Sequence, residues 1–256
     1  MKVATLFVML VAVLSASIGS ALAGTYTTKT LTVGVRKNME ATLYMPDGPG
    51  PFPMVLVLHT SGGISSADQG YCGNLAKEGY ICIAPAFLRA YGITAETRRL
   101  SFTKEAKAIT GDFIEIIGEL NALPKAKQGA VGAVGFSNGG FFAMILASMN
   151  RIKAGVSYYG ALDGARAHPD LKPFQERFTS TSSPVLILAG ENDSTIGMQP
   201  VRKMEEILKA CGAPFELKVY PDTEHDFDRG NLRPGNAAAA KDAWTRTLAF
   251  LRANGV

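Results

Sequence analysis

Short apolar runs alternate along the chain with longer segments in which apolar residues recur at helical spacing. Each run is typical of a strand buried on both faces of a parallel sheet, and each longer segment of a covering helix. The alternation predicts an α/β domain with a mostly parallel central sheet of about eight strands and helices on both faces. Strands are expected at 54–58, 80–84, 131–134, 154–159, 184–189 and 215–220, and helices at 69–77, 102–123, 141–150, 198–211 and 237–251.

Three further segments complete this pattern. Residues 25–35 and 41–44 are rich in β-branched residues at alternating positions and predict two leading strands. Residues 86–100 are expected to form a loop near the strand ends. Residues 160–183 show no clear period and carry two prolines, so they predict an irregular insert beside a pocket. His168 lies in this insert and is given no role.

The first 23 residues form a separate unit. Lys2 precedes an apolar stretch from Val3 to Leu14, and the small-residue sequence Ala21-Leu22-Ala23 follows. This is the pattern of a secretory signal peptide cleaved after Ala23, which predicts a secreted or periplasmic protein and one domain over residues 24–256. The alternative is an uncleaved anchor, but the apolar stretch is short for a span of about 20 residues.

Charge and cysteine content narrow the function classes. The chain carries 26 basic and 22 acidic residues, so loss of Lys2 with the signal leaves 25 − 22 = +3. This charge is small and scattered, which argues against a nucleic-acid or polybasic membrane surface.

The chain has three cysteines, Cys72, Cys82 and Cys211, so at least one is unpaired. Their pairing stays open, and Cys82, in an apolar run, is interpreted as a buried small hydrophobic residue.

The sequence Gly135-Phe-Ser137-Asn-Gly139 lies between a predicted strand and a predicted helix. In a nucleophile elbow the serine occupies a strained turn, and the residues two positions away must be almost free of side chain. Gly135 and Gly139 meet this requirement, and Ser137 becomes the candidate nucleophile. The five-residue pattern alone is weak, because a serine here could simply cap a helix.

The acid and the base follow the serine in chain order. Asp193 comes directly after the strand at 184–189, with Glu191 as a less favoured rival acid. His225 lies on the loop after the last strand. The order Ser137, Asp193, His225 is the order of the triad in α/β-hydrolases. Earlier in the chain, His59 precedes the serine and is therefore interpreted as a structural residue of its loop.

The loop His59-Thr60-Ser61-Gly62-Gly63 follows the buried strand at 54–58. It resembles the glycine-bearing oxyanion loop of α/β-hydrolases, in which a backbone N–H faces the carbonyl oxygen of a bound ester. By position, the N–H groups of Ser61 and Asn138 are predicted to form the oxyanion hole. Neither the three scattered histidines nor the cysteines show the spacing of a metal site, so no metal or organic cofactor is expected.

Three motifs together resemble the dienelactone hydrolase family within the α/β-hydrolase superfamily: 134–140 around the serine, 189–193 at the acid and 223–227 at the base. The resemblance extends over nearly all of residues 24–256 and implies an α/β-hydrolase fold and acyl hydrolysis. Two positions depart from the namesake enzymes, which carry cysteine at Ser137 and glutamate at Thr60. Both changes argue against the namesake's dienelactone as the substrate and leave acyl hydrolysis intact.

The sequence therefore predicts an exported serine hydrolase that cleaves small carboxylic esters or lactones through an acyl-enzyme. Two alternatives stay open. One is a peptidase or amidase on the same scaffold, and the other is a binding protein that keeps the fold without turnover. The natural substrate and the oligomeric state are not predicted.

Overall fold

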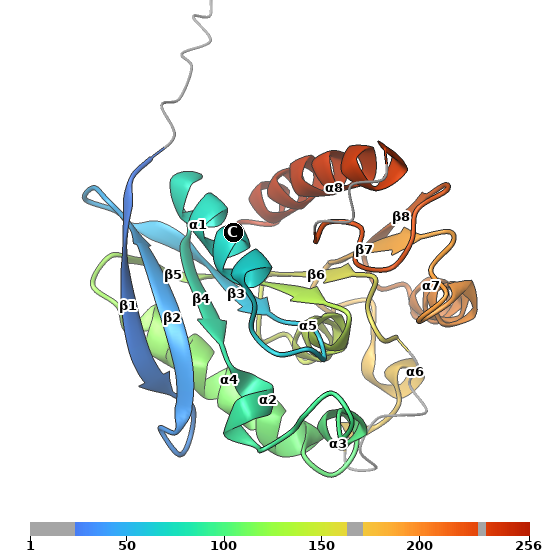
Figure 1. Cartoon of the computed structure of the whole chain (residues 1–256), viewed down its shortest axis with the longest axis horizontal. Helices are drawn as coiled ribbons and strands as arrows, with labels where there is room; N and C mark the ends of the chain where they lie inside the picture. Colours follow the sequence, from blue (N-terminus) through green and yellow to red (C-terminus); the bar gives the residue numbers. More distant parts are fainter. Residues whose placement is uncertain (1–23, 163–170, 230–233) are drawn as a thin grey trace, which may run out of the picture.

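The computed structural model describes residues 24–162, 171–229 and 234–256, so the predicted signal peptide and His168 lie outside the described residues (Figure 1). One eight-stranded sheet runs through the chain in the order β1-β2-β4-β3-β5-β6-β7-β8. β1 and β2 form an antiparallel hairpin, β2 is antiparallel to β4, and the remaining neighbours are parallel. The strands are β1 (Tyr26–Val33), β2 (Met39–Pro46), β3 (Phe52–Leu58), β4 (Ile81–Pro85), β5 (Ala126–Phe136), β6 (Ala154–Tyr158), β7 (Val185–Gly190) and β8 (Phe215–Tyr220).

Helices cover both faces of the sheet, as the apolar pattern predicts. α1 (Ser66–Lys77) and α8 (Pro234–Ala253) pack with one apolar core on one face. The longer helices on the other face are α4 (Ala106–Asn121), α5 (Asn138–Ser148) and α7 (Met198–Cys211). Figure 1 shows α1 and α8 together on the side of the sheet opposite α4. The predicted fold class is confirmed.

The short helices are where sequence and structure differ. The segment expected as a loop at 86–100 contains α2 (Phe87–Ala90), and α3 (Arg99–Phe102) precedes α4 as a separate turn. The helix predicted from residue 102 therefore begins at Ala106. In the described part of the insert at 160–183, α6 (Phe174–Arg177) buries Phe174. Helices of four residues are shorter than the window over which a helical period can be recognised.

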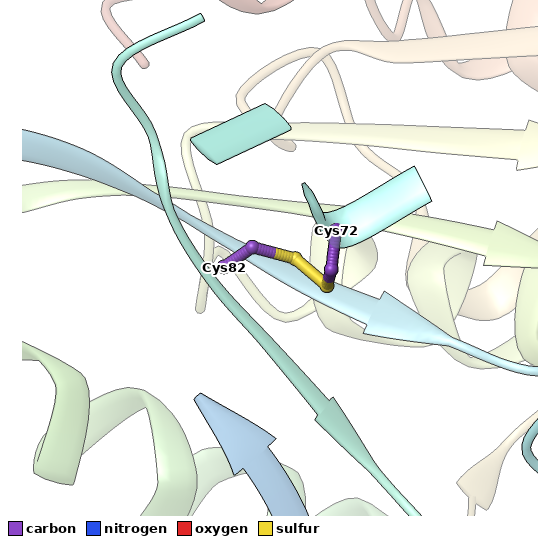
Figure 2. The surroundings of a disulfide bond; sticks show 2 residues. All are labelled: Cys72 and Cys82. Atoms are coloured by element: carbon purple, nitrogen blue, oxygen red, sulfur yellow. A yellow bond between two sulfur atoms is a disulfide. The ribbon is translucent and has the colours of Figure 1, made fainter. Parts of the chain in front are cut away.

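Two cysteines form a disulfide bond between α1 and β4. Figure 2 shows Cys72 on the helix joined to Cys82 on the strand beneath it, with 5.4 Å between their Cα atoms. Both residues are fully buried. The expected burial of Cys82 is confirmed, but the residue is not a simple hydrophobic one, because the packing of α1 on the sheet brings its partner within bonding distance. The pairing that the sequence left open is Cys72 with Cys82. Cys211 is a free thiol at the end of α7.

Candidate active site

Ser137 occupies the sharp turn between β5 and α5. Its backbone has φ 50° and ψ −107°, a strained conformation for a residue with a side chain. A Cβ atom at Gly135 would lie 2.1 Å from the Gly139 carbonyl oxygen, and one at Gly139 would lie 2.0 Å from that of Leu58. Only glycine fits at both positions, and the turn has the geometry of a nucleophile elbow.

The structure brings Ser137, Asp193 and His225 together from three strand ends. His225 Nε2 lies 3.1 Å from Ser137 Oγ, and His225 Nδ1 lies 2.7 Å from Asp193 Oδ2. With Nδ1 protonated, the imidazole donates to the carboxylate and accepts from the serine hydroxyl. All three side chains are largely buried, which strengthens their electrostatic interaction. This is the geometry in which a histidine can remove the serine proton.

The Asp193 carboxylate is held by its own loop. Its Oδ1 accepts hydrogen bonds of 2.9 Å from the N–H groups of Thr195 and Ile196. Burial alone would raise the pKa of Asp193, but the hydrogen bond from His225 and those from the two amides outweigh it and lower the pKa. The rival acid Glu191 is exposed, and it is Asp193 that contacts His225.

The loops that carry the acid and the base are joined to each other. Asn192 N donates to Thr223 O at 2.9 Å, and Glu191 N donates to Tyr220 O at 2.9 Å. Gly190 lies so close to the base loop that a Cβ would be 2.4 Å from Thr223 O. The separation between the carboxylate and the imidazole is therefore fixed by backbone contacts.

The loop after β3 runs beside the elbow. Gly139 N donates to His59 O at 3.1 Å, which places Ser61 close to the start of α5. Thr60 closes the loop by accepting from Gly62 N and Gly63 N, and neither bond uses the Ser61 N–H. Asn138 is the first residue of α5, where an amide has no partner within the helix. The structure thus brings the two predicted oxyanion residues to neighbouring segments.

His59 is the first residue of this loop and is fully buried. Its ring stacks on Phe87 with 4.0 Å between centroids, and its Nδ1 donates to Thr60 O at 2.7 Å. The other ring nitrogen is buried without a hydrogen-bond partner among the described residues. Burial lowers the pKa of His59 to about 4, although the Thr60 carbonyl and the charge of Asp68 oppose the change. These contacts agree with a structural residue.

A buried ion pair near His225 was not predicted from the sequence. Arg229, four residues after His225, donates from Nη2 to Asp68 Oδ1 at 2.6 Å and from Nε to Tyr159 OH at 2.8 Å. Its guanidinium lies 4.1 Å from the centre of the Phe136 ring. The pair holds the base loop against α1 and the end of β5. Asp68 also caps α1 together with Ser65, and the capping pattern Ser-x-x-Asp at 65–68 is readable in the sequence.

The described residues contain no group of three or more histidine, cysteine, aspartate or glutamate side chains placed to hold a metal ion. Within the same ranges, no helix has the length and apolar character needed to cross a bilayer.

Residues 39–255 match the family model described as "Dienelactone hydrolase family". The chain belongs to the dienelactone hydrolase family. A protein of Escherichia coli K12 named "Putative carboxymethylenebutenolidase" is 30% identical over 227 residues, which cover 85% of this chain and 83% of the relative. A carboxymethylenebutenolidase of Rhodococcus opacus is 27% identical over 81% of this chain and 84% of its own length.

Solved structures agree with the fold of the family. A structure titled "Putative Dienelactone Hydrolase" from Klebsiella pneumoniae superposes with a TM-score of 0.74 at 24% identity and covers 89% of this chain and 99% of that one. As a member of the dienelactone hydrolase family, the protein is a carboxylic ester hydrolase with an α/β-hydrolase fold.

Proposed function

We propose that the protein is an exported serine esterase that cleaves carboxylic esters or lactones through a Ser137-Asp193-His225 triad and an acyl-enzyme. The observation that carries the proposal is the continuous line of hydrogen bonds from Asp193 through His225 to Ser137, 2.7 and 3.1 Å long. A serine hydroxyl is a weak nucleophile until a neighbouring base removes its proton.

In the first step His225 Nε2 takes the proton from Ser137 as Oγ attacks the carbonyl carbon of the ester. The tetrahedral intermediate carries a negative oxygen, and the N–H groups of Ser61 and Asn138 are the proposed donors to it. One such donor contributes about 3 kcal/mol to the lowering of the barrier. The imidazolium then protonates the leaving alkoxide, and an acyl group remains on Ser137.

In the second step water takes the place of the alcohol. His225 removes a proton from the water as the water oxygen attacks the acyl carbon. His225 then passes this proton to Ser137 Oγ as the carboxylic acid leaves. Asp193 acts in both steps by orienting the imidazole and stabilising its charged form. No bond in this sequence requires a metal ion or an organic cofactor.

Export is supported by the cysteines of the described chain. Disulfide bonds persist in oxidising compartments such as the periplasm and the extracellular space, and are rare in the cytosol. The Cys72–Cys82 bond fits this expectation, as does the sequence pattern of residues 1–23. Expression of the complete chain in a Gram-negative host, followed by fractionation and mass spectrometry, tests it. We expect a periplasmic product that begins at Gly24, and a cytosolic product that keeps Met1 would contradict it.

Hydrolysis of p-nitrophenyl acetate and butyrate by residues 24–256 tests the chemistry. We expect kcat to fall at least about a thousandfold in Ser137→Ala, because the nucleophile is lost while the fold is kept. Ser148→Ala is a matched control, since its hydroxyl bonds the Ile145 carbonyl at the other end of α5. Activity that survives in Ser137→Ala with unchanged circular dichroism would refute the proposed nucleophile.

A further inference from the structure

Asp226 directly follows the proposed base and places a carboxylate beside it. Its backbone is left-handed, with φ 55°, a conformation that aspartate tolerates better than most residues. One oxygen, Oδ1, lies 4.0 Å from His225 Nε2, although the side chain as a whole is 51% exposed. This oxygen is shielded from solvent and has no hydrogen-bond partner among the described residues. The mechanism proposed above leaves this charge unused.

The nitrogen that Asp226 faces is the one that meets the substrate. In the proposed mechanism Nε2 passes its proton to the leaving oxygen, which must then lie within hydrogen-bond reach, about 3 Å away. The atoms attached to that oxygen therefore lie within several ångströms of the Asp226 carboxylate. A charge on the leaving group is exposed to the field of Asp226 at a distance where, near a protein surface, Coulomb energies remain larger than thermal energy.

The neighbouring cation offers little compensation. Arg229 is paired with Asp68 at 2.6 Å, lies 3.9 Å from Asp228, and has a side chain only 10% exposed. The guanidinium is therefore already neutralised by carboxylates of the chain itself.

We propose that Asp226 determines specificity by disfavouring esters whose leaving group is negatively charged and favouring neutral or cationic ones. The inference rests on the proposed function, because it assumes that His225 Nε2 delivers the proton to the leaving group. It names the substrate class of that site: esters of uncharged or positively charged alcohols.

Three phenyl acetates that differ at the meta position test the inference: carboxylate, methyl carboxylate and trimethylammonium. For each ester, kcat/KM of Asp226→Asn is divided by kcat/KM of the wild type. We expect the ratio for the anionic ester to exceed the ratio for the neutral one about fivefold, and the cationic ratio to fall below it by about the same factor. The neutral ester is the reference, because any effect of the substitution on His225 itself changes the ratios of all three esters equally.

Asp222→Asn is the matched control. Asp222 lies on the same loop, is exposed, and has the same left-handed conformation with φ 52°. Its variant removes the same charge from the loop and should leave the three ratios equal. Addition of 0.5 M NaCl should weaken the charge preference of the wild type, because the exposed part of the carboxylate is screened.

Carbamoylation of Ser137 by phenyl dimethylcarbamates with the same three meta substituents gives a second measurement that needs no turnover. The substituted phenol is the leaving group here too, so its charge lies on the side of His225 as it does in the acetates. Ratios that stay equal across the three esters and the three inhibitors in Asp226→Asn would overturn the inference. Failure of the proposed function has a different signature, namely no Ser137-dependent hydrolysis of the neutral ester by the wild type.

Discussion

Burial of His59 makes the stability of the protein depend on pH. Its pKa is lowered by burial from 6.5 to about 4 in the folded chain. The unfolded chain therefore binds a proton first as the pH falls, so stability is lost below about pH 6.5 and the loss is complete near pH 4. The unpartnered Nε2 explains the sign, because a proton there would add an unpaired charge to a buried site.

The size follows from the difference in pKa. Each pKa unit corresponds to about 1.4 kcal/mol, so the full loss is about 3 kcal/mol. Between pH 7 and pH 5 the linkage relation gives a loss of about 2 kcal/mol, a large fraction of the stability of a typical domain. Urea denaturation at fixed ionic strength measures this quantity directly.

Two variants without a titratable group at this position make the comparison. His59→Asn keeps a donor near the Thr60 carbonyl, and His59→Phe keeps a ring against Phe87. Both lose stability at pH 7 through lost contacts, but this loss does not depend on pH. The advantage of the wild type over either variant should therefore shrink by about 2 kcal/mol between pH 7 and pH 5. An advantage that stays constant over this range would refute the reasoning.

Three further outcomes are expected. Asp193→Asn should lower kcat about 10³ to 10⁴-fold on p-nitrophenyl esters. Its free energy of unfolding in urea should lie below that of the wild type at neutral pH, and this difference should narrow below about pH 4, as the wild-type carboxylate with its lowered pKa is protonated too. Gly139→Ala should abolish esterase activity because its Cβ would lie 2.0 Å from Leu58 O, and an active variant would contradict this tight fit. Gly111→Ala is the control: a Cβ there would meet nothing within 4 Å, so this variant should keep activity and raise the melting temperature. Reduction of the Cys72–Cys82 bond should lower the free energy of unfolding in urea by about 2 to 3 kcal/mol, and the same loss should appear in Cys211→Ala. A urea midpoint that dithiothreitol leaves unchanged would argue against the bond.

The predictable part of the structure is the part encoded locally. The run 54–58 and its counterparts predict the strands because a strand buried on both faces needs a continuous apolar sequence. The turn around Ser137 is equally local, because Gly135 and Gly139 stand two positions on either side of the serine. A Cβ at Gly135 would meet Gly139 of the same turn, and one at Gly139 would meet Leu58 at the end of the neighbouring strand.

The features that were not predicted depend on segments far apart in sequence. Cys72 pairs with Cys82 only because α1 lies over β4, and no spacing rule fixes that pairing. Arg229 meets Asp68 across 161 positions, so its role is invisible without the fold. The position of Asp226 depends on a left-handed backbone at a residue that the sequence presents as one acid among many.

The ion pair between Arg229 and Asp68 has a consequence for the order in which the protein becomes active. Ser137 is synthesised 88 positions before His225, and the loop that carries His225 is held in place by Arg229 still later in the chain. If His225 is the base, as proposed, a growing chain presents its serine without that base, and its hydrolytic centre is incomplete. On the proposed mechanism the protein is inert during translation, and activity begins only when the segment around Arg229 has packed against Asp68.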